Sequence, residues 1–268
     1  MSNTDHITAK VILNSKNLHT NINLTTLELE YPRYIHSELM THRVFSRNAQ
    51  SSRAIPVERQ IELIRDSKWY PIFMKNKRGM EAVEPLDEFE EVSAKGLWDK
   101  SKREAINNAT YLKNLEVHKQ ITNRVIEPFS LIKVIVTATD FTNFFDLRLG
   151  SDAQQEIQVL AKKMKDAISN SSYQELMVGE WHLPYISIDE IGLPLDTKLK
   201  LSVARCARVS YLNHDKTKDL IKDIELHDFL LKSKHMSPFE HQATPSESEE
   251  YFANFNSFIQ YRHSLKYL

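Results

Sequence analysis

The stretch LTTLELEY at residues 24–31 sets the β part of the expected fold. Apolar Leu27, Leu29 and Tyr31 alternate with polar residues, and a period of two is typical of a strand that buries one face. Pro32 follows directly, so we expect the strand to end there.

The next residues have a helical pattern at 34–41 and then a polar stretch at 41–56 (THRVFSRNAQSSRAIP), which is too rich in Ser, Asn and Arg to be core. Arg43, Arg47 and Arg53 lie close together in it, interleaved with short hydroxyl and amide side chains. Guanidinium groups offer a fixed fork of donors that matches phosphate oxygens. A solvated basic loop is the equally common alternative.

Two helices are expected next, at residues 58–67 and 86–115. Gly96 weakens the middle of the second helix, and residues 69–85 between the two are expected to form a long surface loop that could act as a lid. The second helix has apolar residues at three- and four-residue steps, namely Phe89, Val92, Leu97, Ile106, Ala109 and Leu112.

The clearest amphipathic helix follows Ser151 and Asp152, which are good N-cap types. Residues 179–194 (GEWHLPYISIDEIGLP) contain two prolines and two glycines and are predicted to be a linker. A last unit is expected to begin with residues 201–211 and to continue with a helix near 219–232. The apolar face of the amphipathic helix consists of Ala153, Ile157, Leu160, Ala161, Met164 and Ile168.

Composition restricts the class of protein. The chain has 268 residues, 41% of them hydrophobic, and a net charge of −1, so it can bury a core and carries no excess charge for nucleic acid or an anionic membrane surface. No apolar run reaches the roughly 18 residues of a membrane helix, and no signal peptide is evident. A single cysteine, Cys206, fits a reducing, cytoplasmic setting, or the host cytoplasm if the protein is viral.

The sequence offers few other signatures of chemistry. Only five residues are glycine, so glycine-loop phosphate sites are unexpected. His235 and His241 have no standard metal-ligand spacing, and no metal site is predicted. Glu240 beside His241 could be an acid–base pair or a satisfied buried pair. Since no nucleophilic triad can be identified, any chemistry is expected to belong to a cofactor.

Several segments resemble one family. Residues 41–53 (THRVFSRNAQSSR) are similar to the signature of the flavin-dependent thymidylate synthases, in which RHR is followed after seven residues by Ser. Residues 118–128 (HKQITNRVIEP), 143–157 (NFFDLRLGSDAQQEI) and 207–211 (ARVSY) also resemble family motifs, as does HMSPFEH at 235–241.

The order of these motifs differs from the usual one, because ARVSY and SPFEH come last here. The resemblance therefore implies a circular permutation, which is permissible when the old termini lie close together. It implies an α+β fold with helices packed on a mostly antiparallel sheet. The expected organisation is one catalytic domain, 1–268, in which the linker at 179–194 joins residues 1–178 to residues 195–268.

The resemblance implies reductive methylation of dUMP to dTMP with FAD, NADPH and methylenetetrahydrofolate, in a homotetramer with shared active sites. Arg148 and Ser51 are the implied catalytic residues. The implied dUMP contacts are Glu38, Ser51, Arg53, Arg124 and Arg148. The implied flavin and folate contacts are His42, Arg43, Ser46, Asn48, Asn143, Ser210, His235, Ser237 and Glu240.

The sequence departs from the family pattern at four positions of the expected site. Thr41 replaces the first Arg of RHR, Ala49 a Glu, Glu38 a Gln and Thr137 an Asn. Two alternatives stay open for this reason. One is a related enzyme that installs another C5 group, such as hydroxymethyl, on a pyrimidine nucleotide, and the other is a flavin- or nucleotide-binding relative without turnover.

Overall fold

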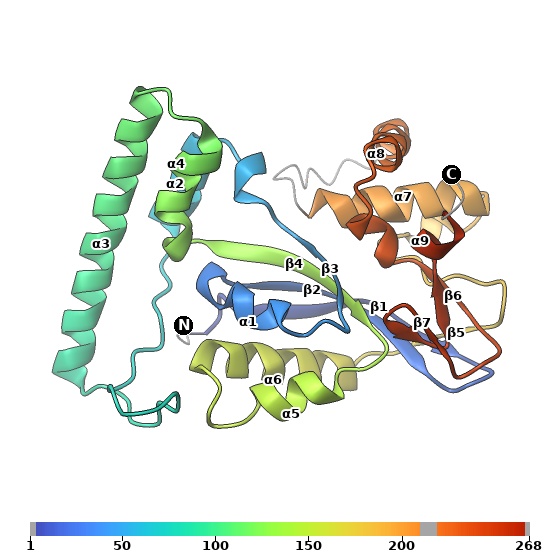
Figure 1. Cartoon of the computed structure of the whole chain (residues 1–268), viewed down its shortest axis with the longest axis horizontal. Helices are drawn as coiled ribbons and strands as arrows, with labels where there is room; N and C mark the ends of the chain where they lie inside the picture. The colour runs from blue at the N-terminus through green and yellow to red at the C-terminus, as the bar shows by residue number, and fades with distance from the viewer. Residues whose placement is uncertain (1–3, 210–218, 266–268) are drawn as a thin grey trace.

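A five-stranded sheet forms the centre of the computed structural model, which describes residues 4–209 and 219–265 (Figure 1). The strand order is β3-β4-β2-β1-β5, and all pairs are antiparallel except β1 with β5. The α+β class with a mostly antiparallel sheet is therefore confirmed. The strands are β1 (Thr8–Asn17), β2 (Asn23–Pro32), β3 (Ser46–Ala49), β4 (Leu131–Ala138) and β5 (Gln174–Leu176).

Helices α5 (Thr142–Arg148) and α6 (Gln155–Ser169) cover one face of this sheet (Figure 1). The expected apolar faces of β2 and α6 meet there in the main core. The helix α6 begins at Gln155, with Gln154 at its N-cap position. The expectation that Ser151 and Asp152 cap it was wrong, because these residues lie in a turn before the helix.

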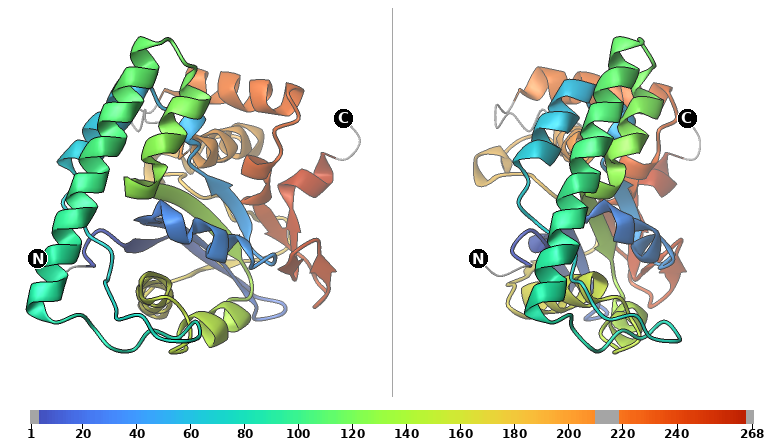
Figure 2. Two further views of the ribbon diagram at one scale, coloured as in Figure 1. Left: turned by 60° about the vertical axis from the view of Figure 1, so that its left-hand side comes forward. Right: turned by 90° about the vertical axis from the view of Figure 1, so that its left-hand side faces the viewer.

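A unit of three helices packs at one end of the sheet: α2 (Val57–Asp66), α3 (Glu88–Asn114) and α4 (Lys119–Ile126). Both expected helices at 58–67 and 86–115 are thus present. The apolar face expected for α3 was only half right. Ile106 and Ala109 are buried against α2 and α4, whereas Phe89, Val92 and Leu97 are exposed. In Figure 2, α3 lies at the edge of the molecule in the left view and crosses its front in the right view, so it lies on the outside of the molecule.

The connection between α2 and α3 is a long loop, as expected, although its first aromatic residue is core. Trp69 is buried, stacks on His6 and contacts Trp98. Further along, Met74 and Pro85 form an isolated bridge that closes the loop on itself.

The polar stretch at 41–56 was wrongly expected to lie outside the core. It follows the short helices η1 (Arg33–Ile35) and α1 (His36–Met40), forms the edge strand β3, and continues into η2 (Ser52–Ala54). Phe45, Ser46 and Asn48 are buried in it. Pairing of β3 with β4 satisfies its backbone, and hydrogen bonds within the chain satisfy its buried polar side chains.

The C-terminal residues pack against the far end of the sheet around helices α7 (Leu195–Arg208) and α8 (Leu220–Lys232). The helix α7 includes the first part of the expected segment 201–211, and residues 210 and 211 of that segment lie outside the described residues. Short elements complete the fold: η3 (Glu127–Phe129), η4 (Ile188–Glu190), η5 (Ser237–Glu240), β6 (Ala243–Pro245), β7 (Tyr251–Phe252), β8 (Phe255–Asn256), β9 (Phe258–Gln260) and α9 (Tyr261–Ser264).

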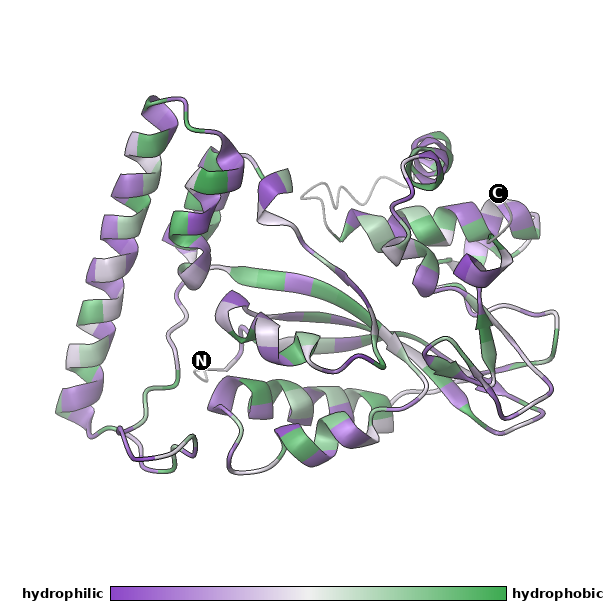
Figure 3. Ribbon diagram, viewed as in Figure 1, coloured by the Kyte–Doolittle hydropathy of each residue, from purple (hydrophilic) through white to green (hydrophobic). Residues whose placement is uncertain are grey.

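Residues 179–194 connect the part of the chain that forms the central sheet to the C-terminal helices. They follow an irregular path and pack against the rest of the chain. His182 is fully buried and exchanges backbone hydrogen bonds with Ala243. The colouring by hydropathy places hydrophobic residues along β4 and α6, where the sheet meets its helical cover (Figure 3). Among the described residues, no helix has the length and apolar character needed to cross a membrane.

Candidate active site

The edge strand β3 is joined to the C-terminal residues by buried hydrogen bonds. Asn48 donates from Nδ2 to the backbone oxygen of Cys206 at 2.8 Å and accepts at Oδ1 from Ser237 Oγ at 3.3 Å. Ser46 Oγ accepts from Gln260 Nε2 at 2.9 Å and from Asn254 Nδ2 at 3.1 Å. These contacts fix the start of the polar loop against η5 and β9.

A groove of about 590 Å³ lies where this loop, α4 and the segment before η5 converge. Its lining includes five residues expected from the sequence, namely Asn48, Ser51, Arg53, His235 and Ser237. Arg53 and His235 are exposed, and Ser51 is half-buried. The volume lies in the range of a small-molecule site. Residues that are about 190 positions apart in the chain thus share one concave surface.

Sequence reasoning missed three polar residues of this groove. Arg47 was noted only as part of the basic cluster. His118 and Gln120, at the start of α4, were quoted within the motif at 118–128 but were not predicted to be site residues. His118 is the N-cap of α4, and its Nδ1 accepts from the backbone N–H of Gln120 at 3.2 Å. No Asp or Glu is among the described residues that line the groove. It is therefore suited to an anionic ligand.

A second cluster surrounds Arg148 at the end of α5. Its Nη1 donates to Glu38 Oε2 at 3.1 Å, its Nη2 to Thr41 Oγ1 at 3.1 Å, and its Nε to His42. Burial, together with the nearby positive charges of Arg148 and Arg47, lowers the pKa of His42. Two of the family departures, Glu38 and Thr41, thus hold the same guanidinium.

The remaining predicted residues are more scattered. Arg124 is exposed and pairs with Glu127 at 2.9 Å. Arg124 and Arg148 are absent from the lining of the groove. Arg43 and Asn143 are exposed, and Glu240 pairs with Arg262. Ser210 lies outside the described residues.

A chain of buried hydrogen bonds runs through the sheet behind the site. His182 bonds to Ser15 Oγ at 2.7 Å and to Thr26 Oγ1 at 2.8 Å. Thr26 bonds to Thr137 at 2.7 Å, and Thr137 bonds to His241 Nδ1 at 2.8 Å. Thr137, another family departure, therefore links β4 to the end of the HMSPFEH segment. Burial lowers the pKa of both histidines to about 3.

Cys206 is buried beside this region, as expected for a small core side chain, and burial raises the pKa of its thiol. A thiol in this state is a poor nucleophile. In the described part of the chain, no group of three or more His, Cys, Asp or Glu side chains is arranged to hold a metal ion.

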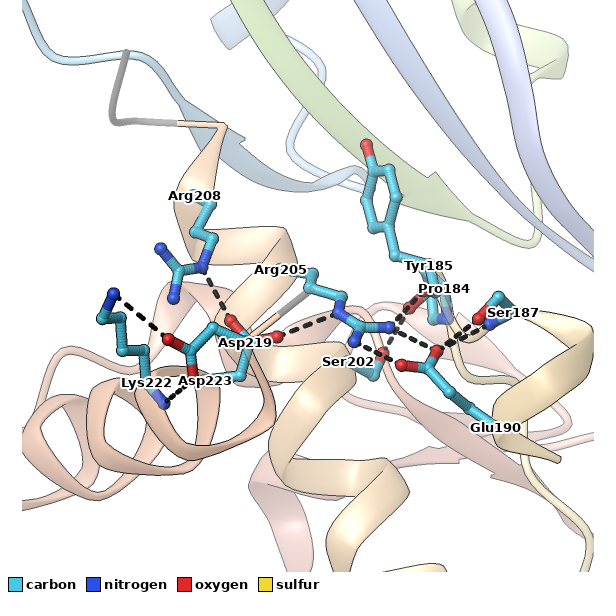
Figure 4. Close-up of polar contacts among 10 residues, drawn as sticks. All are labelled: Pro184, Tyr185, Ser187, Glu190, Ser202, Arg205, Arg208, Asp219, Lys222 and Asp223. Carbon is cyan, nitrogen blue, oxygen red and sulfur yellow. Dashed lines mark hydrogen bonds and ion pairs between the residues drawn. The ribbon is translucent and has the colours of Figure 1, made fainter. Parts of the chain in front are cut away.

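Ion pairs hold the two C-terminal helices and the 179–194 segment together (Figure 4). Arg205 on α7 binds both carboxylate oxygens of Glu190 at 2.6 Å and donates from Nε to Asp223 on α8 at 3.0 Å. Arg208 Nε donates to the other oxygen of Asp223 at 2.7 Å. The network fixes the helix that supplies Ala207 to the groove.

Comparison with known proteins gives one family. The family model described as thymidylate synthase complementing protein matches residues 20–171. This range includes the polar loop, α4 and α5, and it ends before α7 and the HMSPFEH segment. None of the curated proteins matches the sequence.

Two solved structures align with parts of this chain. The UMP/dUMP methylase PolB from Streptomyces cacaoi, bound with 5-Br UMP, aligns with a TM-score of 0.50 and 15% identity, over 61% of this chain and 88% of that chain. Flavin-dependent thymidylate synthase ThyX from Helicobacter pylori, complexed with FAD and dUMP, aligns with a TM-score of 0.37 and 20% identity, over 54% of this chain and 67% of that chain.

Proposed function

Because this chain belongs to the thymidylate synthase complementing protein family, the flavin-dependent thymidylate synthases, we propose that it methylates dUMP at C5 with FAD, NADPH and methylenetetrahydrofolate. The observation that carries the proposal is the groove: Ser51 and Arg53 from the family loop face His235 and Ser237 across a concavity lined by arginine and histidine without a carboxylate. A nucleotide monophosphate needs such an anion site.

In this proposal Arg53 and Ser51 bind the phosphate end of dUMP. Arg53 provides a charge-assisted fork of donors, and the hydroxyl of Ser51 adds a short hydrogen bond. The exposed start of α4, with His118 and Gln120, faces the same anion. Arg124 lies one helical turn further along α4 and would reach the sugar or phosphate from outside the groove.

Arg148 is the proposed group that polarises the uracil ring. A permanently charged guanidinium would stabilise the enolate charge that develops on a uracil carbonyl oxygen when the ring is attacked at C6. The hydrogen bonds from Arg148 to Glu38, Thr41 and His42 would fix the orientation of its guanidinium group before substrate arrives. The reaction would then not have to reorient this side chain.

The residues present also fit a flavin. Arg43, Asn143, His235, Ser237 and Glu240 are at least partly exposed and would hold FAD, while the buried His42, Ser46 and Asn48 support the loop beneath them. When bound, FAD supplies the hydride for the reduction. Because Cys206 is buried, the chain's own part is to position the ligands and polarise the uracil rather than to supply a thiolate.

The proposal includes the permuted order of motifs and a homotetramer with shared sites. The bond between Asn48 and Ser237 supports the first, since it joins the RHR-like loop to the SPFEH-like segment across the chain. A chain in which the usual motif order is restored should keep the same flavin site.

Release of flavin on dilution would support the homotetramer with shared sites, and retention of flavin by a proven monomer would contradict it.

The test is nucleotide product analysis by mass spectrometry with dUMP and all three cosubstrates. Formation of dTMP is the expected result. A hydroxymethyl product would instead indicate the related C5-modifying activity. Binding of flavin and dUMP without any product would instead favour the relative without turnover. For substitutions of the arginines that line the groove, Arg59→Ala is a suitable control, because Arg59 is an exposed arginine that pairs with Glu62 outside this groove.

A further inference from the structure

The N-terminal half of α3 has an exposed apolar face that nothing in the described chain covers. Phe89 is 81% exposed, Val92 65% and Leu97 67%. At 100° per residue, Phe89, Val92 and Gly96 fall on one side of the helix, opposite the buried Ala105 and Ala109. Hydrophobic residues recur along all of α3 among hydrophilic ones (Figure 3).

Gly96 occupies the centre of this face. A Cβ added there would meet nothing within 4 Å, so the chain itself does not require a glycine at this position. Glycine inside a helix costs about 1 kcal/mol relative to alanine. Its absence of a side chain instead lets another helix approach the backbone closely.

The charges along α3 are separated and select one kind of partner. Acidic Glu88, Glu90 and Glu91 lie before Gly96, and basic Lys100, Lys102 and Arg103 lie after it. The three charges that break this order, Lys95, Asp99 and Glu104, are each paired with a neighbour on α3. Two of these, Glu88 and Arg103, have no ion pair within residues 4–209 and 219–265. They lie eight residues before and seven residues after Gly96, so the unpaired charges are almost symmetric about the glycine.

We propose that this face binds the same face of a second copy of this chain, as an antiparallel helix pair that crosses at Gly96. In that arrangement residue 89 of one copy lies opposite residue 103 of the other. Glu88 of each copy then lies near Arg103 of the other copy, which gives two equivalent ion pairs. Each Phe89 ring lies beside an arginine side chain. A parallel pair would place like charges together, which disfavours it.

Cysteine crosslinking tests the geometry. The native Cys206 is fully buried and unavailable, so a Gly96→Cys variant presents one new thiol on the symmetry axis. A disulfide needs the two Cα atoms within roughly 7 Å, and mild oxidation should give a covalent dimer. Asn108→Cys is the matched control. It is also exposed on α3, but antiparallel copies would separate its two positions by about 36 Å.

Charge exchange and sedimentation test the energetics in the full-length protein. Phe89→Glu with Val92→Glu should halve the sedimenting mass, whereas Ile221→Glu, at a residue 70% exposed on α8, should leave it unchanged. Glu88→Lys and Arg103→Glu should each weaken association at least tenfold, and the double exchange should restore it.

Three results would overturn the proposal. The first is a native protein that sediments as a monomer at all concentrations. The second is crosslinking of Asn108→Cys as efficient as that of Gly96→Cys. The third is a Phe89→Glu, Val92→Glu protein with native mass. None of these readouts depends on nucleotide or flavin. A native monomer would also contradict the proposed homotetramer, whereas the crosslinking and Phe89→Glu, Val92→Glu results bear on the α3 face alone.

Discussion

The Nε of Arg148 donates a hydrogen bond to Nε2 of His42 at 3.1 Å. A guanidinium group stays protonated and can only donate, so Nε2 of His42 must carry the lone pair. The imidazole is then neutral, with its proton on Nδ1, and the Asn143 side chain provides its second hydrogen bond. The contact therefore specifies both the tautomer of His42 and the direction of Arg148.

An Arg148→Met variant should raise the pKa of His42, because after burial the charge of Arg148 lowers this pKa more than the charge of Arg47 does. The proposed role of Arg148 also predicts a kcat lower by roughly 10²- to 10³-fold. NMR titration of His42 in the protein without ligands measures the pKa. Arg43→Met is the control, since Arg43 does not contribute to that shift. An unchanged pKa in Arg148→Met would contradict the assigned hydrogen bond.

The buried histidines predict a loss of stability in mild acid. His182 and His241 have pKa values of about 3 in the folded chain, whereas an unfolded histidine has an ordinary pKa near 6.5. The unfolded state therefore takes up protons first, and stability present at about pH 7 is lost as the pH falls from 6.5 toward 3. At about pH 5 each group should cost about 2 kcal/mol.

Urea denaturation at about pH 7.5 and about pH 5 checks this prediction. A His241→Gln variant should lose about half of the difference that these two groups produce, since glutamine does not titrate. His6, His36 and His227 also have lowered pKa values, but they act equally in both proteins. An identical pH dependence in the variant would show that His241 is not the neutral buried group inferred here.

The sequence predicted an element of the fold correctly where the pattern involved only residues that are close together in the chain. The alternation at residues 24–31 and the apolar face of α6 both describe one element against one core, and both were right. The polar loop failed as a prediction because its buried residues are satisfied by distant partners. Asn48 bonds to Cys206 and Ser237, and no local pattern gives such pairs.

The candidate site shows the same limit. The motif resemblance identified Ser51, Arg53, His235 and Ser237, which the structure brings to one groove. His118 and Gln120 were missed because their position depends on how α4 packs, and distant contacts such as the buried bonds from Asn123 to Ser52 and Ile55 fix that packing. The one signal for them in the sequence was that His118 and Gln120 directly precede the NRVIEP part of a family-like motif.

An Arg205→Ala variant should be among the most destabilising single changes. The side chains of Glu190 and Asp223 are only 6% and 4% exposed. Removal of Arg205 leaves the buried Glu190 carboxylate without its ion pair and the Asp223 carboxylate with Arg208 alone. Breaking such a pair costs about 3–5 kcal/mol. Equilibrium unfolding in urea measures the loss.

The matched control is Lys222→Ala, which removes an exposed partner of Asp219 at the start of α8 and should cost less than about 1 kcal/mol. An Arg205→Ala protein as stable as the control would mean that water replaces the guanidinium. Repacking with apolar residues at all three positions should recover part of the stability, because a buried ion pair often gains little over well-packed apolar side chains.

An Arg53→Ala variant separates nucleotide binding from the stability of the site. Arg53 is exposed, makes no ion pair within the described residues, and lines the groove, so its removal should leave the fold intact. A charge-assisted hydrogen bond contributes about 1.5–3 kcal/mol, which corresponds to a 10- to 150-fold weaker affinity for dUMP. Isothermal titration with dUMP and with deoxyuridine measures the difference.

The nucleoside lacks the phosphate, so its affinity should be nearly equal in the native and Arg53→Ala proteins. Arg53→Lys should recover part of the dUMP affinity, because a lysine keeps the charge but loses the fork of donors. If deoxyuridine binding fell as much as dUMP binding, Arg53 would act on the base or on the loop rather than on the phosphate. The orientation proposed for the nucleotide in the groove would then have to be reversed.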